Sequence, residues 1–170
     1  MKTSNGMRPQ DVAVLLKIVS MGKQPWLAKD LAAALHLSPA EVSNSLNRSA
    51  LAGLIDQSKR AVLRRPLLDF LQHGLPYVFP QLPGGMVRGV PTAHSAPPLK
   101  ARFLSEEAFV WPSAKGTLKG QAIMPLYPGA VEAALMDEEL HALLALTDAL
   151  RVGRTRERAE AAKELARRLK

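Results

Sequence analysis

WLAKDLAAALHLSPAEVSNSLNRSALAGLI, residues 26–55, is the stretch that decides the fold. Its first half predicts a helix from about Leu27 to Leu35, because Leu27, Leu31 and Leu35 recur at spacings of four and form one apolar face. His36 and Leu37 are expected to form a tight turn, and a second helix is expected to begin directly after it.

The second helix has a complete start signal. Ser38 is a favoured N-cap residue, Pro39 suits the first helical position, and Glu41 is placed to close a capping box. Gly53 is expected to end the helix as the C′ residue. Two helices joined by so short a turn predict a helix-turn-helix, a motif whose second helix enters the major groove of DNA. An ordinary helical hairpin is the alternative.

The two faces of this second helix differ in chemistry. Val42, Leu46 and Ala50 recur at spacings of four and are expected to pack inward. A solvated face without a DNA role would more often mix Lys and Glu, which favours the DNA-binding interpretation. The residues expected to lie on the exposed side and to contact base edges are Ser43, Asn44, Asn47 and Arg48.

Charge is distributed unevenly along the chain, whose formal net charge is +8. Residues 1–66 hold ten Lys or Arg against four Asp or Glu, and residues 151–170 hold eight against three. Residues 67–150 are acidic instead, with five basic and eight acidic side chains. Basic ends favour contact with a polyanion, and an acidic middle favours contact with a protein or a second copy. Solubility alone is the alternative reason for a basic composition.

A helix is also predicted before this motif, from Pro9 to Met21, and Gly22 is expected to stop it. Three helices in this order, followed by Gly53-Leu54-Ile55, resemble the winged helix-turn-helix regulators of the MarR-like type. The resemblance covers residues 9–65 and implies that residues 38–52 form a recognition helix. It departs from the family pattern at His36, where a Gly is common, and at Ser45 and Ser49, where apolar residues are common.

The resemblance also implies a wing after the recognition helix. Residues 56–60 would form its tip and residues 61–63 a returning strand. Basic residues of a wing hold phosphates, which adds affinity that falls with salt. Alternatively, the basic cluster leads into the next helix, predicted at residues 66–72, as a solvated turn. The residues in question are Lys59, Arg60, Arg64 and Arg65.

Residues 76–128 change character, because they contain most of the prolines and exclude a long helix. They are too apolar and aromatic for a disordered linker, so an ordered, mostly irregular layer is expected. Short strands are predicted at residues 77–79, 86–90 and 118–123.

The C-terminal segment, residues 129–170, is predicted to be helical again. A short helix at residues 128–136 precedes a helix that Asp137 caps and Gly153 ends. The last helix, residues 154–170, is strongly charged, with a narrow apolar stripe that suits a surface helix or pairing with a copy of itself. Its stripe is predicted at Ala159, Ala162, Leu165, Ala166 and Leu169.

Several kinds of chemistry are not expected. The absence of cysteine excludes disulfides and Cys-based zinc sites. His94 and Ser95 are adjacent on an extended segment, so their side chains point apart, and no acid is near to orient the imidazole. We therefore expect no catalytic residue, no metal site and no cofactor. No apolar run approaches the roughly 18 residues of a membrane span, and no signal-peptide core begins the chain, so a cytoplasmic protein without membrane contact is expected. The first seven residues are expected to be a frayed tail.

Together these patterns predict a mainly α protein in three parts. These are a DNA-binding domain at residues 1–75, the Pro- and Gly-rich layer at residues 76–128, and C-terminal helices at residues 129–170 that contact a second copy or a partner. The expected function is a transcriptional regulator that binds double-stranded DNA as a homodimer, since such proteins bind two half-sites about one DNA turn apart. The alternative is an antitoxin-like interaction protein, which would neutralise a toxin or a nucleotidyltransferase through its C-terminal half.

Overall fold

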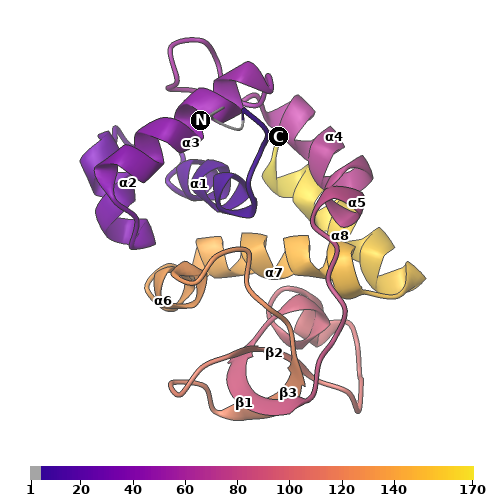
Figure 1. The fold of residues 1–170 in the computed structure, drawn as a ribbon. Helices are drawn as coiled ribbons and strands as arrows, with labels where there is room; N and C mark the ends of the chain where they lie inside the picture. Colours follow the sequence, from indigo (N-terminus) through magenta and orange to yellow (C-terminus); the bar gives the residue numbers. More distant parts are fainter. Residues whose placement is uncertain (1–4) are drawn as a thin grey trace.

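The computed structural model describes residues 5–170, so residues 1–4 of the expected N-terminal tail lie outside it. The fold is mainly helical, as predicted, and contains a small three-stranded sheet (Figure 1). The elements in chain order are α1 (Pro9–Ser20), α2 (Ala28–Leu35), α3 (Pro39–Leu51), α4 (Arg64–His73), α5 (Leu75–Val78), β1 (Met86–Pro91), the 3-10 turns η1 (Ala93–Ser95) and η2 (Leu99–Ala101), β2 (Phe109–Pro112), β3 (Leu118–Ala122), α6 (Ala130–Leu135), α7 (Glu138–Val152) and α8 (Thr155–Arg168).

Helix α1 lies at the centre of the N-terminal helices. Pro9 occupies its first turn, and the Asp11 carboxylate accepts a hydrogen bond from the Arg8 N–H at 2.8 Å. It is buried on nearly all sides, as a helix with apolar residues around its whole circumference must be. It packs against α2, α3 and α7. The predicted helix is confirmed, and Gly22, in the left-handed region at φ 62°, follows it.

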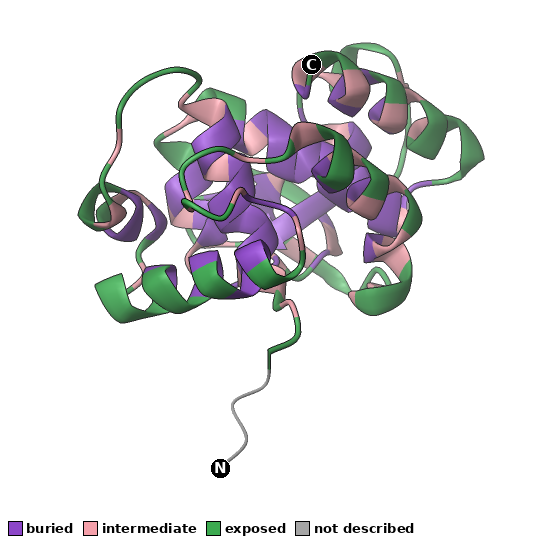
Figure 2. Ribbon diagram, turned by 90° about the horizontal axis from the view of Figure 1, so that it is seen from above, coloured by how far each residue is buried: buried purple, intermediate pink, exposed green. Residues whose placement is uncertain are grey.

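Helix α7 crosses the middle of the molecule, between the N-terminal helices and the strands (Figure 1). Its predicted cap is confirmed, because the Asp137 side chain accepts from the Leu140 N–H at 3.0 Å. The same carboxylate accepts from the Lys17 ammonium at 2.6 Å and the Ser20 hydroxyl at 3.0 Å, both of α1. Figure 2 shows that buried residues concentrate on the inward sides of the helices around this centre.

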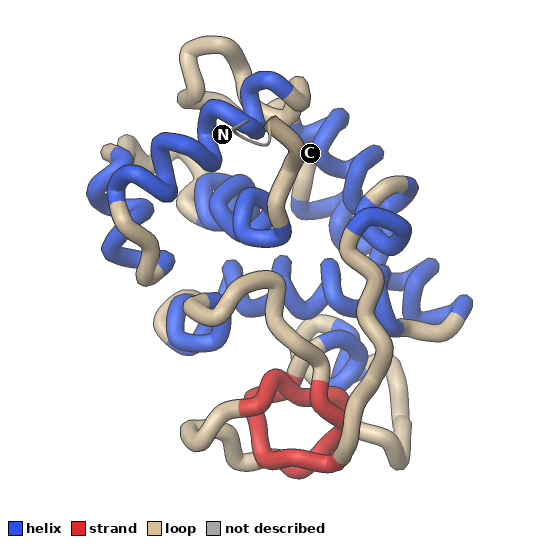
Figure 3. The backbone as a smooth tube through the Cα atoms, in the orientation of Figure 1, coloured by secondary structure: helices blue, strands red, loops and turns tan. Residues whose placement is uncertain are grey.

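The three strands curl into a closed ring (Figure 3). Strand β1 is antiparallel to both β2 and β3, while β2 and β3 are parallel. Backbones approach closely inside the ring: a Cβ on Gly89 would lie 2.0 Å from the Trp111 carbonyl oxygen, so only glycine fits there. The strands predicted near β1 and β3 are confirmed, whereas β2 was not predicted.

The strand predicted at residues 77–79 is wrong. Residues 75–78 form the short helix α5, with Pro76 in its first turn, where its missing N–H costs nothing. Leu75 is fully buried in the core and fixes this turn against α4 and α7. A three-residue aromatic segment is ambiguous by pattern alone, and burial of its neighbour decides the outcome.

A buried carboxylate fastens the sheet to α7. Asp148 of α7 accepts hydrogen bonds from the Thr92 hydroxyl and the Trp111 indole N–H, both at 2.7 Å. Arg151, one turn later, donates to the other carboxylate oxygen at 3.0 Å and to the Phe79 carbonyl at 2.9 Å. Because a buried charge is tolerated only when it is paired and hydrogen-bonded, this cluster specifies where the strands sit on α7.

Helix α8 lies on α7 and α4 and covers the core with a different stripe from the one predicted. Leu165 and Leu169 are buried as expected, but Ala159 is exposed and Ala161 is buried in its place. The acidic Glu164 is also buried, because Arg167 and Arg168 both donate to it. Because these ion pairs bury an acidic residue, the buried face of α8 is rotated about the helix axis relative to the apolar stripe that was predicted from hydropathy alone.

Candidate nucleic-acid interface

The turn between α2 and α3 is sharp, and a residue far along the chain, Tyr127, hydrogen-bonds to it. His36 occupies the left-handed region at φ 55°, where a Gly is more usual. The Tyr127 hydroxyl donates to the Leu35 carbonyl at 2.9 Å, and this pair is buried. Burial raises the pKa of Tyr127 above its ordinary value, so the phenol remains a donor. The turn therefore holds α2 and α3 in a fixed relation.

Helix α3 begins with the predicted capping box. The Ser38 hydroxyl accepts from the Glu41 N–H at 3.1 Å, and Glu41 accepts from the Ser38 N–H at 2.7 Å. The backbone hydrogen bond from Ser38 lowers the pKa of Glu41. The acidic side chain nearest the start of α3 is therefore occupied by its own helix.

The inward face of α3 agrees with the prediction, since Val42, Leu46 and Ala50 are buried. The smaller Ser45 and Ser49 are buried as well, and α3 packs along α1. The outward face is made of Ser43, Asn44 and Asn47, all exposed as predicted.

Arg48 was predicted to share that exposed face, and this prediction is wrong. Its side chain is only about a tenth exposed, and its Nε and Nη2 donate to both oxygens of Asp11 at 2.8 and 2.7 Å. These hydrogen bonds raise the pKa of Arg48 above its ordinary value. The buried carboxylate on α1 draws the guanidinium inward, because a buried charge requires an opposite one. Arg48 is therefore a structural residue and does not reach the α3 surface.

A compact hairpin follows α3. Ile55 pairs with Val62 in an antiparallel bridge, and the Leu63 N–H donates to the Leu54 carbonyl at 2.9 Å. The Asp56 carboxylate organises the loop between them, accepting from the Ser58 hydroxyl at 2.6 Å and from two backbone N–H groups. These bonds, led by that from Ser58, lower the pKa of Asp56.

Two of the predicted basic residues lie on this hairpin and contact the helical pair. Lys59, in the left-handed region at φ 59°, donates to the Asn47 side-chain oxygen of α3. Arg60 lies over the Trp26 ring at 4.9 Å and donates to the Trp26 carbonyl at 2.9 Å. Lys59 thus joins the hairpin to the outward face of α3 at Asn47, while Arg60 joins it to the segment before α2.

Arg64 and Arg65 belong to the first turn of α4, which begins two residues earlier than predicted. Arg64 donates to the Arg168 carbonyl at 3.4 Å, and Arg65 pairs with Asp69 at 3.2 Å along the same helix. This part of the basic cluster therefore lies inside the next helix, and not in a wing or in a solvated turn before that helix.

Sequence reasoning missed a hollow beside the hairpin. It has a volume of about 250 Å³ and lies between the loop after α1, the hairpin and the start of α4. Three cationic residues from these separate segments line it, namely Lys23, Arg60 and Arg64. Such convergence cannot be read from spacing, although the Arg60–Trp26 pair that forms one wall is a familiar stacking combination.

Other kinds of site find no support in the described part of the chain. His94 lies on the 3-10 turn η1 and not on an extended segment as predicted, and a carboxylate oxygen of Glu157 lies 3.9 Å from its Nδ1, where no acid was expected. Its Nε2 contacts the Glu107 carbonyl at 2.7 Å, while the Ser95 hydroxyl accepts from the Phe109 N–H at 2.9 Å, so the two side chains serve different partners. Residues 5–170 contain no group of three His, Asp or Glu side chains arranged to hold a metal ion. None of the helices described is both long and apolar enough for a bilayer crossing.

Comparison of the chain with protein-family models, with curated proteins and with solved structures finds no match.

Proposed function

We propose that the protein is a sequence-specific regulator that binds double-stranded DNA, with α3 in the major groove and the 56–61 hairpin against the backbone. The observation that supports this most is the outward face of α3, where Ser43, Asn44 and Asn47 are exposed and uncharged, and where Lys59 of the hairpin contacts Asn47. Base edges are read by such short hydrogen-bonding side chains, and phosphates by the cations. The order α2, turn, α3 and hairpin supports a winged helix-turn-helix arrangement.

The α3 surface is free of negative charge except at its start. Glu41 is the one acidic residue of α3, and it is held in the capping box. Asp56 of the hairpin is likewise bonded to Ser58 and to N–H groups of its own loop. Because DNA repels carboxylates, a docking face whose two acids are both engaged within the protein suits a polyanion better than one with free carboxylates. With Arg48 bonded to Asp11, base readout would fall to Ser43, Asn44 and Asn47.

The contact between Lys59 and Asn47 bears on which base is read. An ammonium group only donates, so the Asn47 atom that faces Lys59 is the carbonyl oxygen. The amide N–H₂ group of Asn47 and the ammonium of Lys59 then offer donors alone. Adenine requires both a donor and an acceptor from asparagine, whereas the O6 and N7 atoms of guanine are both acceptors. We therefore expect guanine to be preferred opposite Asn47.

The hollow lined by Lys23, Arg60 and Arg64 suits a phosphate group of the same duplex. Its cations come from three segments, so a phosphate there would be approached from several directions. Each phosphate contact of this kind contributes about 0.9 to the slope of log affinity against log salt. A homodimer on two half-sites about one helical turn apart is part of the proposal.

Selection of binding sequences from a pool of random duplexes tests the proposal. Enrichment of one motif, repeated about one helical turn apart, is the expected result. Recovery of a random pool after several rounds would contradict sequence-specific binding. The Asn44→Ala and Asn47→Ala variants should then lose the motif while keeping their thermal stability, because both side chains are exposed.

A further inference from the structure

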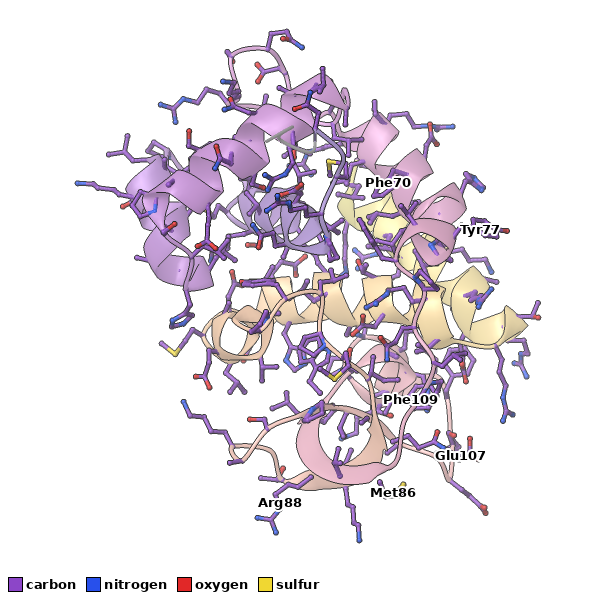
Figure 4. All side chains as sticks on the ribbon, in the orientation of Figure 1. Phe70, Tyr77, Met86, Arg88, Glu107 and Phe109 are labelled. Atoms are coloured by element: carbon purple, nitrogen blue, oxygen red, sulfur yellow. The ribbon has the colours of Figure 1, made fainter. Side chains whose placement is uncertain are left out.

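A second surface lies on the other side of α4, away from the hairpin. It is a groove of about 400 Å³ between α4, α5 and α8, with Leu150 of α7 at its base. Ala159 and Ala162 of α8 line it with small side chains, so an apolar side chain has room to enter. Pro76 and Tyr77 line it from α5, and Figure 4 shows Tyr77 projecting outward at the edge of the molecule.

Tyr77 is exposed to an unusual degree for its size, with 84% of its surface accessible. Val78 and Leu82, which follow it, are exposed as well. Single exposed apolar residues need no explanation, but Tyr77 is both exposed and part of the lining of a groove, and exposed apolar surface at a groove marks an interaction site in many proteins. Tyrosine and arginine are also the residues that most often dominate binding energy at protein interfaces.

Within residues 5–170, the lining of the groove carries a positive charge and no negative one. Arg158 lines it, and its Nε donates to the Gly153 carbonyl at 2.7 Å, which fixes the direction of the guanidinium. Among the described residues no carboxylate pairs with Arg158, and no acidic residue lines the groove.

The acidic residues of α8 are engaged elsewhere. Glu157 accepts from the Arg154 N–H at 2.8 Å, and Glu160 accepts from Arg102 at 2.7 Å. Glu164 is bonded to the two arginines that follow it on α8. Hydrogen bonds from Lys163 and from Arg102 lower the pKa of Glu160, so this carboxylate stays ionised and paired. The positive charge at the groove is therefore left for an external group.

We propose that this groove binds an acidic peptide segment of another protein, in which an apolar side chain stands next to an Asp or Glu. The apolar side chain enters between Ala159, Ala162 and Leu150 and packs on Tyr77, while the carboxylate pairs with Arg158 in bidentate fashion. A duplex does not explain this surface, because phosphates need no aliphatic floor and the groove offers one arginine. The proposal is independent of DNA binding by α3.

Phage selection from a random peptide library on the full-length protein provides the probe, followed by fluorescence anisotropy with the labelled winning peptide. Enriched peptides are expected to share an acidic residue beside an aliphatic or aromatic one. Tyr77→Ala and Arg158→Ala should each weaken binding by about tenfold or more. Arg156→Ala is the matched control, because Arg156 lies on the same helix but lines the neighbouring hollow, with Arg102 and Phe103, and not the groove itself. Thermal melts verify that all variants remain folded.

Several results would overturn the proposal. Failure to enrich any peptide, enrichment without an acidic residue, or equal loss in the Arg156→Ala control would each exclude a site for acidic peptides. Sedimentation at several protein concentrations tests whether a second copy of the chain occupies the groove. A dimer in the wild-type protein that is absent in Tyr77→Ala would assign the groove to a second copy. Duplex binding that falls in Arg158→Ala but not in Arg156→Ala would assign it to nucleic acid.

Discussion

Arg48 of α3 donates to both carboxylate oxygens of Asp11 on α1, at 2.8 and 2.7 Å, and both side chains are buried. This bidentate pair fixes the rotation of α3 about its own axis. Ser43, Asn44 and Asn47 therefore face outward together. A contact on the inner face of α3 thus decides which residues lie on its outer face.

Replacement of Arg48 should reveal this structural role. Arg48→Met leaves the Asp11 carboxylate buried without its partner and is expected to lower the free energy of unfolding by about 3–5 kcal/mol. Adding Asp11→Asn should recover part of that loss, because the buried charge is then removed while the cap of α1 is kept. Urea denaturation measures both effects, with Asn44→Ala as a surface control. An unchanged unfolding midpoint in Arg48→Met would show that the pair contributes nothing.

The turn between α2 and α3 offers a stabilising change. His36 adopts φ 55°, a conformation that costs an L-residue roughly 1 kcal/mol and glycine almost nothing. His36→Gly is expected to raise the melting temperature slightly, because the gain in the folded turn exceeds the added freedom of the unfolded chain. Ala34→Gly, two residues earlier and inside α2, should lower the free energy of unfolding by about 1 kcal/mol, and the melting temperature with it. A fall in both variants would mean that the His36 side chain itself stabilises the turn.

Acid should weaken the junction of α1 and α7 through Asp137. Burial raises the pKa of its carboxyl, but hydrogen bonds from Lys17, the Leu140 N–H and Ser20 outweigh burial, so the pKa lies below the ordinary 3.8. A carboxyl with a lowered pKa contributes stability above its unfolded pKa and loses it as pH falls through the folded value.

The measurement is the free energy of unfolding between neutral pH and pH 2. The wild-type protein should lose more stability below about pH 4 than Asp137→Asn does, since the amide does not titrate. Parallel curves for the two proteins would assign the acid sensitivity to other carboxylates.

Lys59 should influence base preference as well as affinity. If it holds the Asn47 amide with its donors outward, Lys59→Ala frees the Asn47 oxygen and shifts the preference from guanine toward adenine at one position of the site. The salt slope should also fall by about one phosphate contact. A uniform loss of affinity over all sequences, with no change of preferred base, would mean that Lys59 contacts only the backbone.

The helices other than α5 were predictable because their signals are local. Ser38 with Glu41 marks the start of α3, and Asp137 marks the start of α7, each through a side chain that bonds to a backbone N–H three residues later. Gly22 and Gly53 mark two helix ends by another local signal, since both adopt a positive φ that glycine tolerates. Such pairings need no information from distant parts of the chain.

The misplaced residues depend on contacts between distant segments. Arg48 turns inward because Asp11, 37 residues away, is buried opposite it. Strand β2 exists because Trp111 bonds to Asp148 on α7 and because Gly89 admits the Trp111 backbone. The hollow lined by Lys23, Arg60 and Arg64 combines three segments in the same manner. The spacing of residues along the sequence does not predict contacts between such distant segments.

Binding of fluorescent duplexes by anisotropy, at several salt concentrations, tests the central claim most directly. The duplexes are the motif enriched by selection and a scrambled version of it. We expect tight binding to the motif, weaker binding to the scramble, and loss of the difference when both Asn44 and Asn47 are replaced by Ala. Equal affinity for the two duplexes, with a steep salt slope and no effect of the double substitution, would contradict sequence recognition by α3.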